Sequence, residues 1–179
     1  MKGYRRENPA FSLCGLCCCL CPIHRMEGGC PGCGGGEGHQ GCAVIRCALA
    51  HGGPESCAQC RDYPCPRLEE FARFDSFVPH RNLFRDLERQ RTEPERLAAE
   101  LAEKGRLLTV LLEHYNDGRR KSFFCTAVNL LPVGDTAAVL ERLDGSLPLK
   151  ERAAQSVRLL QEAAQARGIS LKLLKKPKV

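Results

Sequence analysis

Twelve of the thirteen cysteines lie between Cys14 and Cys65, and this cluster of thiols is the strongest chemical signal in the 179-residue chain. Four pairs of cysteines share the spacing C-x2-C, with two residues between the thiols. One such turn can aim two sulfurs at a single ion, and two turns complete a tetrahedral site. The pattern therefore predicts thiolate-ligated metal. The four pairs are Cys14/Cys17, Cys18/Cys21, Cys30/Cys33 and Cys57/Cys60.

The ligand type alone does not separate zinc from an iron–sulfur cluster, because four thiolates suit both. Prolines follow Cys21, Cys30 and Cys65, as in cluster-binding segments that end in Cys-Pro, but the bacterial ferredoxin order C-x2-C-x2-C-x3-C-P is absent. Zinc with a structural role is the favoured interpretation. A [4Fe-4S] protein of electron transfer or redox catalysis is the alternative, and thiol redox or disulfide chemistry is a third.

The cysteines fall into five motifs: Cys14-Gly15-Leu16-x-Cys18-x2-Cys21-Pro22, Cys30-x-Gly32-Cys33, Cys42-x2-Ile45-x-Cys47, Cys57-x2-Cys60 and Tyr63-Pro64-Cys65. This pattern closely resembles the DUF3795 family of bacteria and archaea. The stretches "YNDGRRKSFFCTAVNLLP" and "RGISLKL" are similar to its longer subgroup. The resemblance implies zinc binding but carries no known activity.

The resemblance sorts the thiols into expected ligands and extra ones. Cys17 and Cys19 fall where the family pattern is free, so they are additional thiols, as is Cys125. Two mononuclear zinc sites need four ligands each, so a shared-sulfur site or unused ligands stay open. The expected ligands are Cys14, Cys18, Cys21, Cys30, Cys33, Cys42, Cys47, Cys57, Cys60 and Cys65.

Three histidines, His24, His39 and His51, could each replace a cysteine as a ligand. A single histidine in a loop is more often exposed to solvent than bound to metal. The histidines are therefore kept as substitutes for the ten cysteines and not as first choices.

The step in cysteine content predicts two parts, a metal-binding module over residues 1–66 and a helical domain over 67–179 with a short extended basic tail. Residues 14–65 show no sustained helical or strand period and are dense in glycine, so loops and turns with one short helical turn are expected. This segment has too few large apolar side chains to fold by burial alone. The fold class is therefore mainly α, with about four to five helices after the module.

Helical patterns account for most of the second part. Helices are expected over 66–74 and 80–91, then in a long stretch that a Thr92–Glu95 capping box begins and "NDG" ends. "KSFFCTAVNLLP" favours a buried helix, and "GDTAAVLERLDG" a short helix capped by Asp135 or Thr136. "LKERAAQSVRLLQEAAQARG" predicts a longer helix with Gly168 as its left-handed cap. The tail "ISLKLLKKPKV" predicts a short strand or an extended arm.

Charge suggests a possible further partner. Residues 1–65 carry a formal +1 and residues 66–179 a formal +5, with one basic cluster at Arg119, Arg120 and Lys121. Solvated charge is the simpler interpretation, and a zinc-dependent nucleic-acid-binding protein is the second alternative. Sparse aromatics and the lack of Trp argue against a dedicated single-strand binder. A second basic cluster comprises Lys172, Lys175, Lys176 and Lys178.

Cys125 stands alone between apolar residues, next to "GRRKS". It is either a small buried hydrophobe or a thiol whose pKa the nearby cations lower, reactive or able to bind metal.

The sequence lacks the signals of secreted proteins, membrane proteins and the common enzyme classes. No secretory signal and no run of about 18 to 20 apolar residues is readable, so the protein is expected to be cytoplasmic without membrane contact. No nucleophile, base and orienting group form a catalytic pattern, so enzyme activity is left undecided. An unknown protein partner for the helical part is compatible with these features.

Overall fold

A computed structural model describes residues 3–7, 9, 11–39 and 41–177 of the chain. Within this part there are seven α-helices and two short 3-10 helices, with no strand beyond an isolated bridge between Arg5 and Gly35. The mainly α prediction is confirmed. The elements are η1 (Cys18–Leu20), α1 (Ala43–Ala50), η2 (Cys57–Gln59), α2 (Pro66–Ala72), α3 (Leu83–Thr92), α4 (Pro94–His114), α5 (Lys121–Leu130), α6 (Val133–Glu141) and α7 (Leu149–Ala166).

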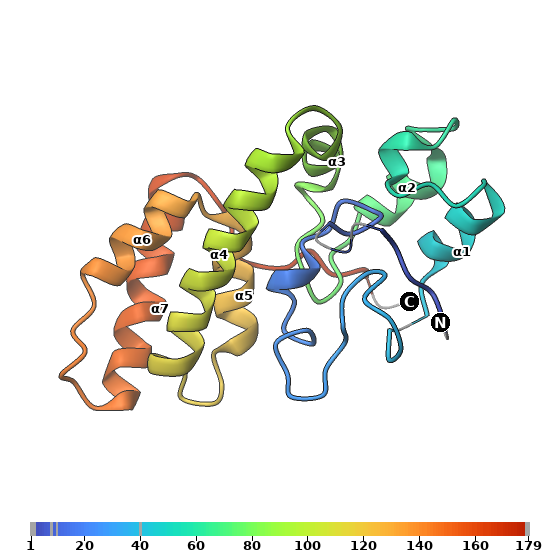
Figure 1. Cartoon of the computed structure of the whole chain (residues 1–179). Helices are drawn as coiled ribbons and strands as arrows, with labels where there is room; N and C mark the ends of the chain where they lie inside the picture. Colours follow the sequence, from blue (N-terminus) through green and yellow to red (C-terminus); the bar gives the residue numbers. More distant parts are fainter. Residues whose placement is uncertain (1–2, 8, 10, 40, 178–179) are drawn as a thin grey trace.

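The helices separate into two ends of an elongated molecule (Figure 1). The helices α4 to α7 pack side by side at one end, while α1, α2 and the N-terminal loops lie at the other, with α3 between them. From Pro66 onward the described chain has six α-helices, where four to five were expected. The cysteine-containing segment is also more helical than expected, because α1 makes two full turns around the position of Cys47.

Two apolar clusters hold the two ends together, and both draw residues from each side of residue 66. The first cluster joins Leu13 and Ile45 to Leu83 and Leu87 of α3. The second joins Leu20 of η1 to side chains of α4, α5, α6 and α7. The cysteine segment therefore packs against α2 and α3 in one cluster and against α4 to α7 in the other.

The long helix α4 follows its leucine stripe. Leu97, Leu107, Leu108 and Leu111 are buried, and their spacing places them on one face. The outer face carries ion pairs such as Arg106 to Glu103 at 2.7 Å. The helix that "KSFFCTAVNLLP" predicted is α5, and residues 124–130 are all buried.

The expected capping box at Thr92 does not form. Thr92 is the last residue of α3, where its hydroxyl donates to the carbonyl of Glu88 at 2.9 Å. The break falls at Glu93, whose φ of −145° is extended, because the residue before a proline avoids the helical region. Pro94 then occupies the first turn of α4, where its missing N–H costs nothing.

The expected caps of α6 are also wrong, by three or four residues, because the N-cap is Pro132. This helix begins at Val133 after Pro132, which places Asp135 and Thr136 inside the first turn. A carboxylate there still favours the helix through the dipole. Asp135 also accepts two hydrogen bonds from Arg167 at 2.8 Å each, which joins the start of α6 to the end of α7.

The predicted left-handed cap of α7 is confirmed. Gly168 has a φ of +66°, a region that a residue with a Cβ rarely adopts. This turn lets the amide of Ile169 donate to the carbonyl of Ala164 at 2.8 Å and the amide of Gly168 donate to Gln165 at 3.0 Å. The chain can then turn back from the helical end.

The C-terminal tail is an extended arm that returns to the other end of the molecule. Asp75 binds it at both backbone groups of Leu174: the Asp75 amide donates to the Leu174 carbonyl, and the Leu174 amide donates to the Asp75 carboxylate, each at 2.7 Å. Arg81 donates to the carbonyls of Ser170 and Lys172 at 2.7 and 2.8 Å. These bonds set the tail beside α2. Lys178 lies outside the described residues.

We expect Asp75→Ala to release this arm. The carboxylate accepts from the Leu174 amide, and a hydrogen bond to a charged group contributes about 1.5–3 kcal/mol. Trypsin should then cleave after Lys172 about tenfold faster, as followed by mass spectrometry of a timed digest. Asp144→Ala, in a loop at the far end, is the control, and equal cleavage rates in the two variants would contradict the prediction.

Candidate metal centre

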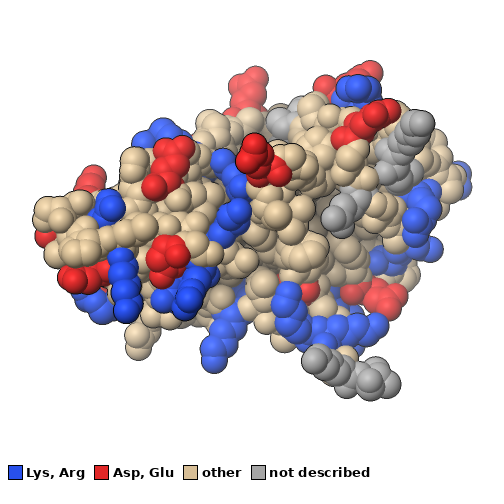
Figure 2. Space-filling model, turned by 90° about the horizontal axis from the view of Figure 1, so that it is seen from below, with Lys and Arg blue, Asp and Glu red and all other residues tan. Residues whose placement is uncertain are grey.

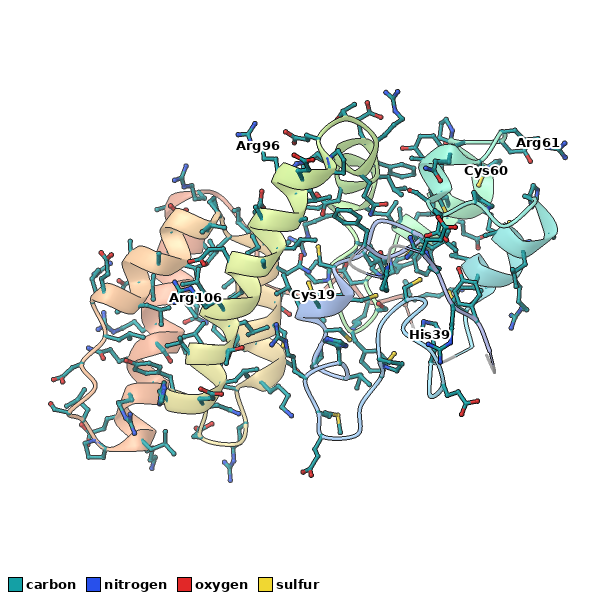
Figure 3. The ribbon with its side chains drawn as sticks, viewed as in Figure 1. Cys19, His39, Cys60, Arg61, Arg96 and Arg106 are labelled. Carbon is teal, nitrogen blue, oxygen red and sulfur yellow. The ribbon has the colours of Figure 1, made fainter. Side chains whose placement is uncertain are left out.

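All thirteen cysteines lie in the described part of the chain and all are free thiols. They are spread over the loops, the two 3-10 helices, α1 and α5, and many are wholly or partly buried. Figure 3 shows Cys60 in the turn before α2 and Cys19 in η1, close to the helical end. The thiols are thus distributed over two regions of the molecule.

Four sulfurs, which we name the first sulfur group, gather where the N-terminal loops meet: Cys14, Cys18, Cys33 and Cys42. Burial, together with repulsion from the thiolates of Cys33 and Cys42, raises the pKa of Cys14 to about 12. Burial likewise raises the pKa of Cys18, and repulsion from the thiolates of Cys14, Cys33 and Cys21 contributes. The amide of Leu13 donates to Sγ of Cys33 at 3.4 Å. A set of buried thiols that would repel one another when ionised is stabilised by a cation.

Four more sulfurs, the second sulfur group, line one small apolar cavity between α1, η2 and α2: Cys47, Cys57, Cys60 and Cys65. Burial raises the pKa of Cys57 to about 12, and repulsion from the thiolates of Cys14, Cys65, Cys60 and Cys47 contributes, so Cys57 also lies near the first sulfur group. Cys47 comes from α1, Cys57 and Cys60 from the C-x2-C turn at η2, and Cys65 immediately precedes α2. Three separate elements therefore converge on this cavity.

Hydrogen bonds join the loops that carry the two sulfur groups. The Cys57 amide donates to the Leu13 carbonyl at 2.8 Å. Gln90 of α3 accepts from the Ser56 hydroxyl at 2.9 Å and donates to the carbonyl of Ser12 at 3.2 Å. Gln90 thus holds both Ser12, which precedes Cys14, and Ser56, which precedes Cys57, against α3. No sequence signal marked Gln90, because a glutamine on an amphipathic helix looks like any surface residue.

Arg6 is a second contributor that the sequence did not reveal. Its side chain is only 3% exposed, and its guanidinium donates to the carbonyls of Phe11, Cys33 and Glu55. It also lies 3.5 Å from the carboxylate of Glu55. This cation therefore holds three loop segments around the first sulfur group, and it opposes the rise in the pKa of Cys33 that burial causes.

Two expected ligands lie outside the two groups. A thiolate at Cys21 would repel those of both Cys18 and Cys125. Cys30 presents its backbone carbonyl to the Nδ1 atom of His24 at 2.8 Å. We therefore assign eight of the ten expected ligands to the two groups and leave these two outside them.

The additional thiols Cys17 and Cys19 face the helical end. Sγ of Cys17 donates to the carboxylate of Asp86 at 3.6 Å, and Asp86 pairs with Arg85 at 3.0 Å. Burial and this carboxylate both raise the pKa of Cys17 far above its usual value. Burial also raises the pKa of Cys19, against the effect of Arg25. A carboxylate next to the Cys17 thiol holds it protonated, so it packs as a small apolar side chain.

Cys125 is buried in α5, with 1% of its surface exposed. Burial raises its pKa to about 12, and the opposing effect of Arg25 and Lys121 is smaller. The cations of "GRRKS" therefore do not produce a reactive thiolate, and the packing interpretation of this residue is the one the geometry favours.

Replacing Cys125 with alanine is expected to leave the bound metal unchanged and to lower the free energy of unfolding by about 1 kcal/mol, because only a small buried group is lost. Metal per chain, measured by elemental analysis, and urea unfolding check the two parts. A variant that lost one equivalent of metal would show instead that Cys125 is a ligand.

The histidines have other partners. Nδ1 of His51 lies 2.7 Å from the carbonyl of Cys47, and its Nε2 lies 3.1 Å from the carboxylate of Asp62. His24 faces a carbonyl as described above, and the ring of His39 packs 6.5 Å from that of Tyr4. His51 also lines the cavity of the second sulfur group, with Nδ1 3.8 Å from Sγ of Cys47. It is therefore placed to orient Cys47 or to replace one of the cysteines as a ligand.

As the described side chains stand, no three of cysteine, histidine, aspartate or glutamate converge closely enough to hold a metal ion. The donor set nonetheless fits one, since each sulfur group offers four thiols. Binding would require the sulfurs of a group to close around the ion.

No protein-family model, curated protein or solved structure matches this chain. The resemblance to the DUF3795 family stays a prediction. None of the described helices is long and apolar enough to cross a membrane.

Proposed function

We propose that the protein binds two zinc ions through cysteine thiolates and that the ions have a structural role. The observation that carries this proposal is that Cys47, Cys57, Cys60 and Cys65, from three separate elements, line one cavity, with the first sulfur group beside it. Four thiolates close the coordination sphere of zinc, which is typical of structural sites and leaves no position for a substrate.

The first sulfur group would hold one ion and the second group the other. Zinc would supply positive charge to the clustered thiols, and it would displace their protons on binding. Arg6 and Gln90 would hold the loops so that the sulfurs can close, as groups outside a ligand set commonly do.

The structural role follows from how little apolar packing the cysteine segment has of its own. In the first apolar cluster, the fully buried large side chains of this segment are Leu13 and Ile45, and the others come from α2 and α3. Loops with so small a core are ordinarily stabilised by cross-links. Two ions joining Cys14 to Cys42 and Cys47 to Cys65 would cross-link most of this segment.

Elemental analysis of protein purified without oxygen tests the proposal. About two zinc ions per chain and no visible absorption are expected. Iron with an equal amount of acid-labile sulfide would assign the same thiols to a cluster and overturn the zinc proposal. A metal-free preparation that keeps its full circular dichroism and thermal stability would overturn the structural role.

A further inference from the structure

A groove with uncompensated positive charge lies next to the second sulfur group, between α1, α2 and the C-terminal tail. Arg67 and Arg73 of the α2 segment and Lys176 of the tail line it, together with the single carboxylate of Glu70. We name it the basic groove. Arg67 also borders the cavity of the second sulfur group. Lys and Arg side chains gather along the lower edge of the molecule in Figure 2.

The tertiary fold assembles this charge. Lys176 reaches α2 because Asp75 and Arg81 hold the tail there, and Lys175 beside it donates to the carbonyl of Ser76 at 2.6 Å. The sequence contained Lys176 in a basic cluster, but nothing in the sequence joined that cluster to α2.

The three cations of the groove differ from most of the surface arginines. Elsewhere, Arg89 lies 2.5 Å from Glu93 and Arg106 lies 2.7 Å from Glu103. Among the described residues, none of Arg67, Arg73 and Lys176 lies within ion-pair distance of a carboxylate. Three cations and one carboxylate leave the groove with a formal charge of +2, available to an anionic ligand.

Aromatic side chains lie among these cations. The guanidinium carbon of Arg73 is 5.9 Å from the centre of the Phe74 ring, and Phe71 also lines the groove. The Phe71 ring packs 4.6 Å from that of His80, whose Nδ1 lies 2.8 Å from the Phe71 carbonyl. Phe71 is thus held in place, while Phe74 is half-buried with part of its surface accessible.

We propose that the basic groove binds a short stretch of single-stranded nucleic acid. Arg67, Arg73 and Lys176 would bind phosphates, and a guanidinium matches the geometry of phosphate oxygens. An unstacked base would lie against Phe74, which is the combination of cations and aromatic surface that single strands use. An acidic peptide would pair with the cations but would not stack on Phe74. The bases of a duplex are stacked on one another and cannot reach this ring.

Fluorescence anisotropy with labelled oligouridylate and oligothymidylate of about ten nucleotides tests this proposal. Both should bind at low salt, with an affinity that falls as salt rises. Arg67→Glu/Arg73→Glu should weaken binding by about tenfold or more and reduce the salt slope by about two. Which of the two oligomers binds more tightly distinguishes RNA from DNA as the source.

The matched control reverses the same number of charges elsewhere. Arg96 and Arg106 project from α4, away from α2 (Figure 3), with side chains 82% and 62% exposed. Arg96→Glu/Arg106→Glu should retain the wild-type affinity within about twofold. Equal loss in both double variants would show attraction by net charge alone and overturn the proposal, as would failure of the wild type to bind at low salt.

Phe74→Leu separates a nucleic acid from an acidic peptide. Loss of stacking should weaken oligonucleotide binding by about fivefold or more. Unchanged affinity, with polyglutamate competing as well as the oligonucleotide, would assign the groove to acidic peptides and overturn the proposal. Arg67 borders the cavity of the second sulfur group, so Arg73→Glu alone is tested as well. Bound metal should be the same as in the wild type in Arg73→Glu and Phe74→Leu, and weakened binding in these two variants is then independent of whether the thiols hold zinc.

Discussion

Serine in place of both Cys57 and Cys60 is expected to remove about one of the two zinc ions and to unfold α1 and α2. These cysteines form one C-x2-C turn and are half of the second sulfur group. A structural zinc site contributes about 10–16 kcal/mol of binding free energy at neutral pH, which equals or exceeds the whole stability of a typical domain. Zinc per chain and amide hydrogen exchange in residues 43–72 measure the two effects.

The matched control is Cys17→Ser/Cys19→Ser, which also removes two thiols of the cysteine segment. These thiols face the helical end, and a serine hydroxyl at position 17 can still donate to Asp86. Both zinc ions should remain. Loss of an ion from this control, or full retention by the Cys57→Ser/Cys60→Ser variant, would show that the sulfurs are sorted wrongly.

Truncating Leu20 to alanine should lower the free energy of unfolding by about 2–5 kcal/mol. Leu20 belongs to η1, between two cysteines, yet its side chain is 0% exposed and packs with Leu108, Leu111 and Phe124 of the helical end. The deletion leaves a cavity at the point where the cysteine segment enters that core. Urea unfolding followed by far-ultraviolet circular dichroism measures the change.

Leu149→Ala is the control for this truncation, because Leu149 is a leucine of α7 that is 43% exposed. A surface position should change the free energy of unfolding by about 0.5 kcal/mol or less. An equally small change in the free energy of unfolding for Leu20→Ala would contradict the packing of the two ends through η1. Unfolding of the cysteine segment alone, with the helices intact, would contradict it as well.

Helix type and approximate position could be predicted where a long apolar period was present. The leucine stripe of α4 and the glycine after α7 are local signals, and both elements occur where they were expected. The caps at Thr92 and Asp135 were predicted wrongly because a hydroxyl or carboxylate near a helix start can bond in several ways. Proline geometry set the actual boundaries, at Pro94 and Pro132.

The helix α1 was missed for a different reason. Its sequence, "AVIRCALA", lies among glycines and cysteines and is too short to show two helical periods. Packing of Val44, Ile45 and Ala48 against the first apolar cluster stabilises it, and such tertiary contacts are absent from the local pattern.

The sequence by itself determined the chemistry that the protein can offer: thiols in C-x2-C turns, a mainly helical second part and clusters of cations. Only the tertiary structure decided which of these groups meet. It set Cys47, Cys57, Cys60 and Cys65 around one cavity, turned Cys17 toward Asp86, and carried the tail to α2 so that Lys176 joins Arg67. The physical reason is that spacing along the chain constrains only neighbouring residues, whereas these contacts depend on burial and hydrogen bonds between segments distant in sequence.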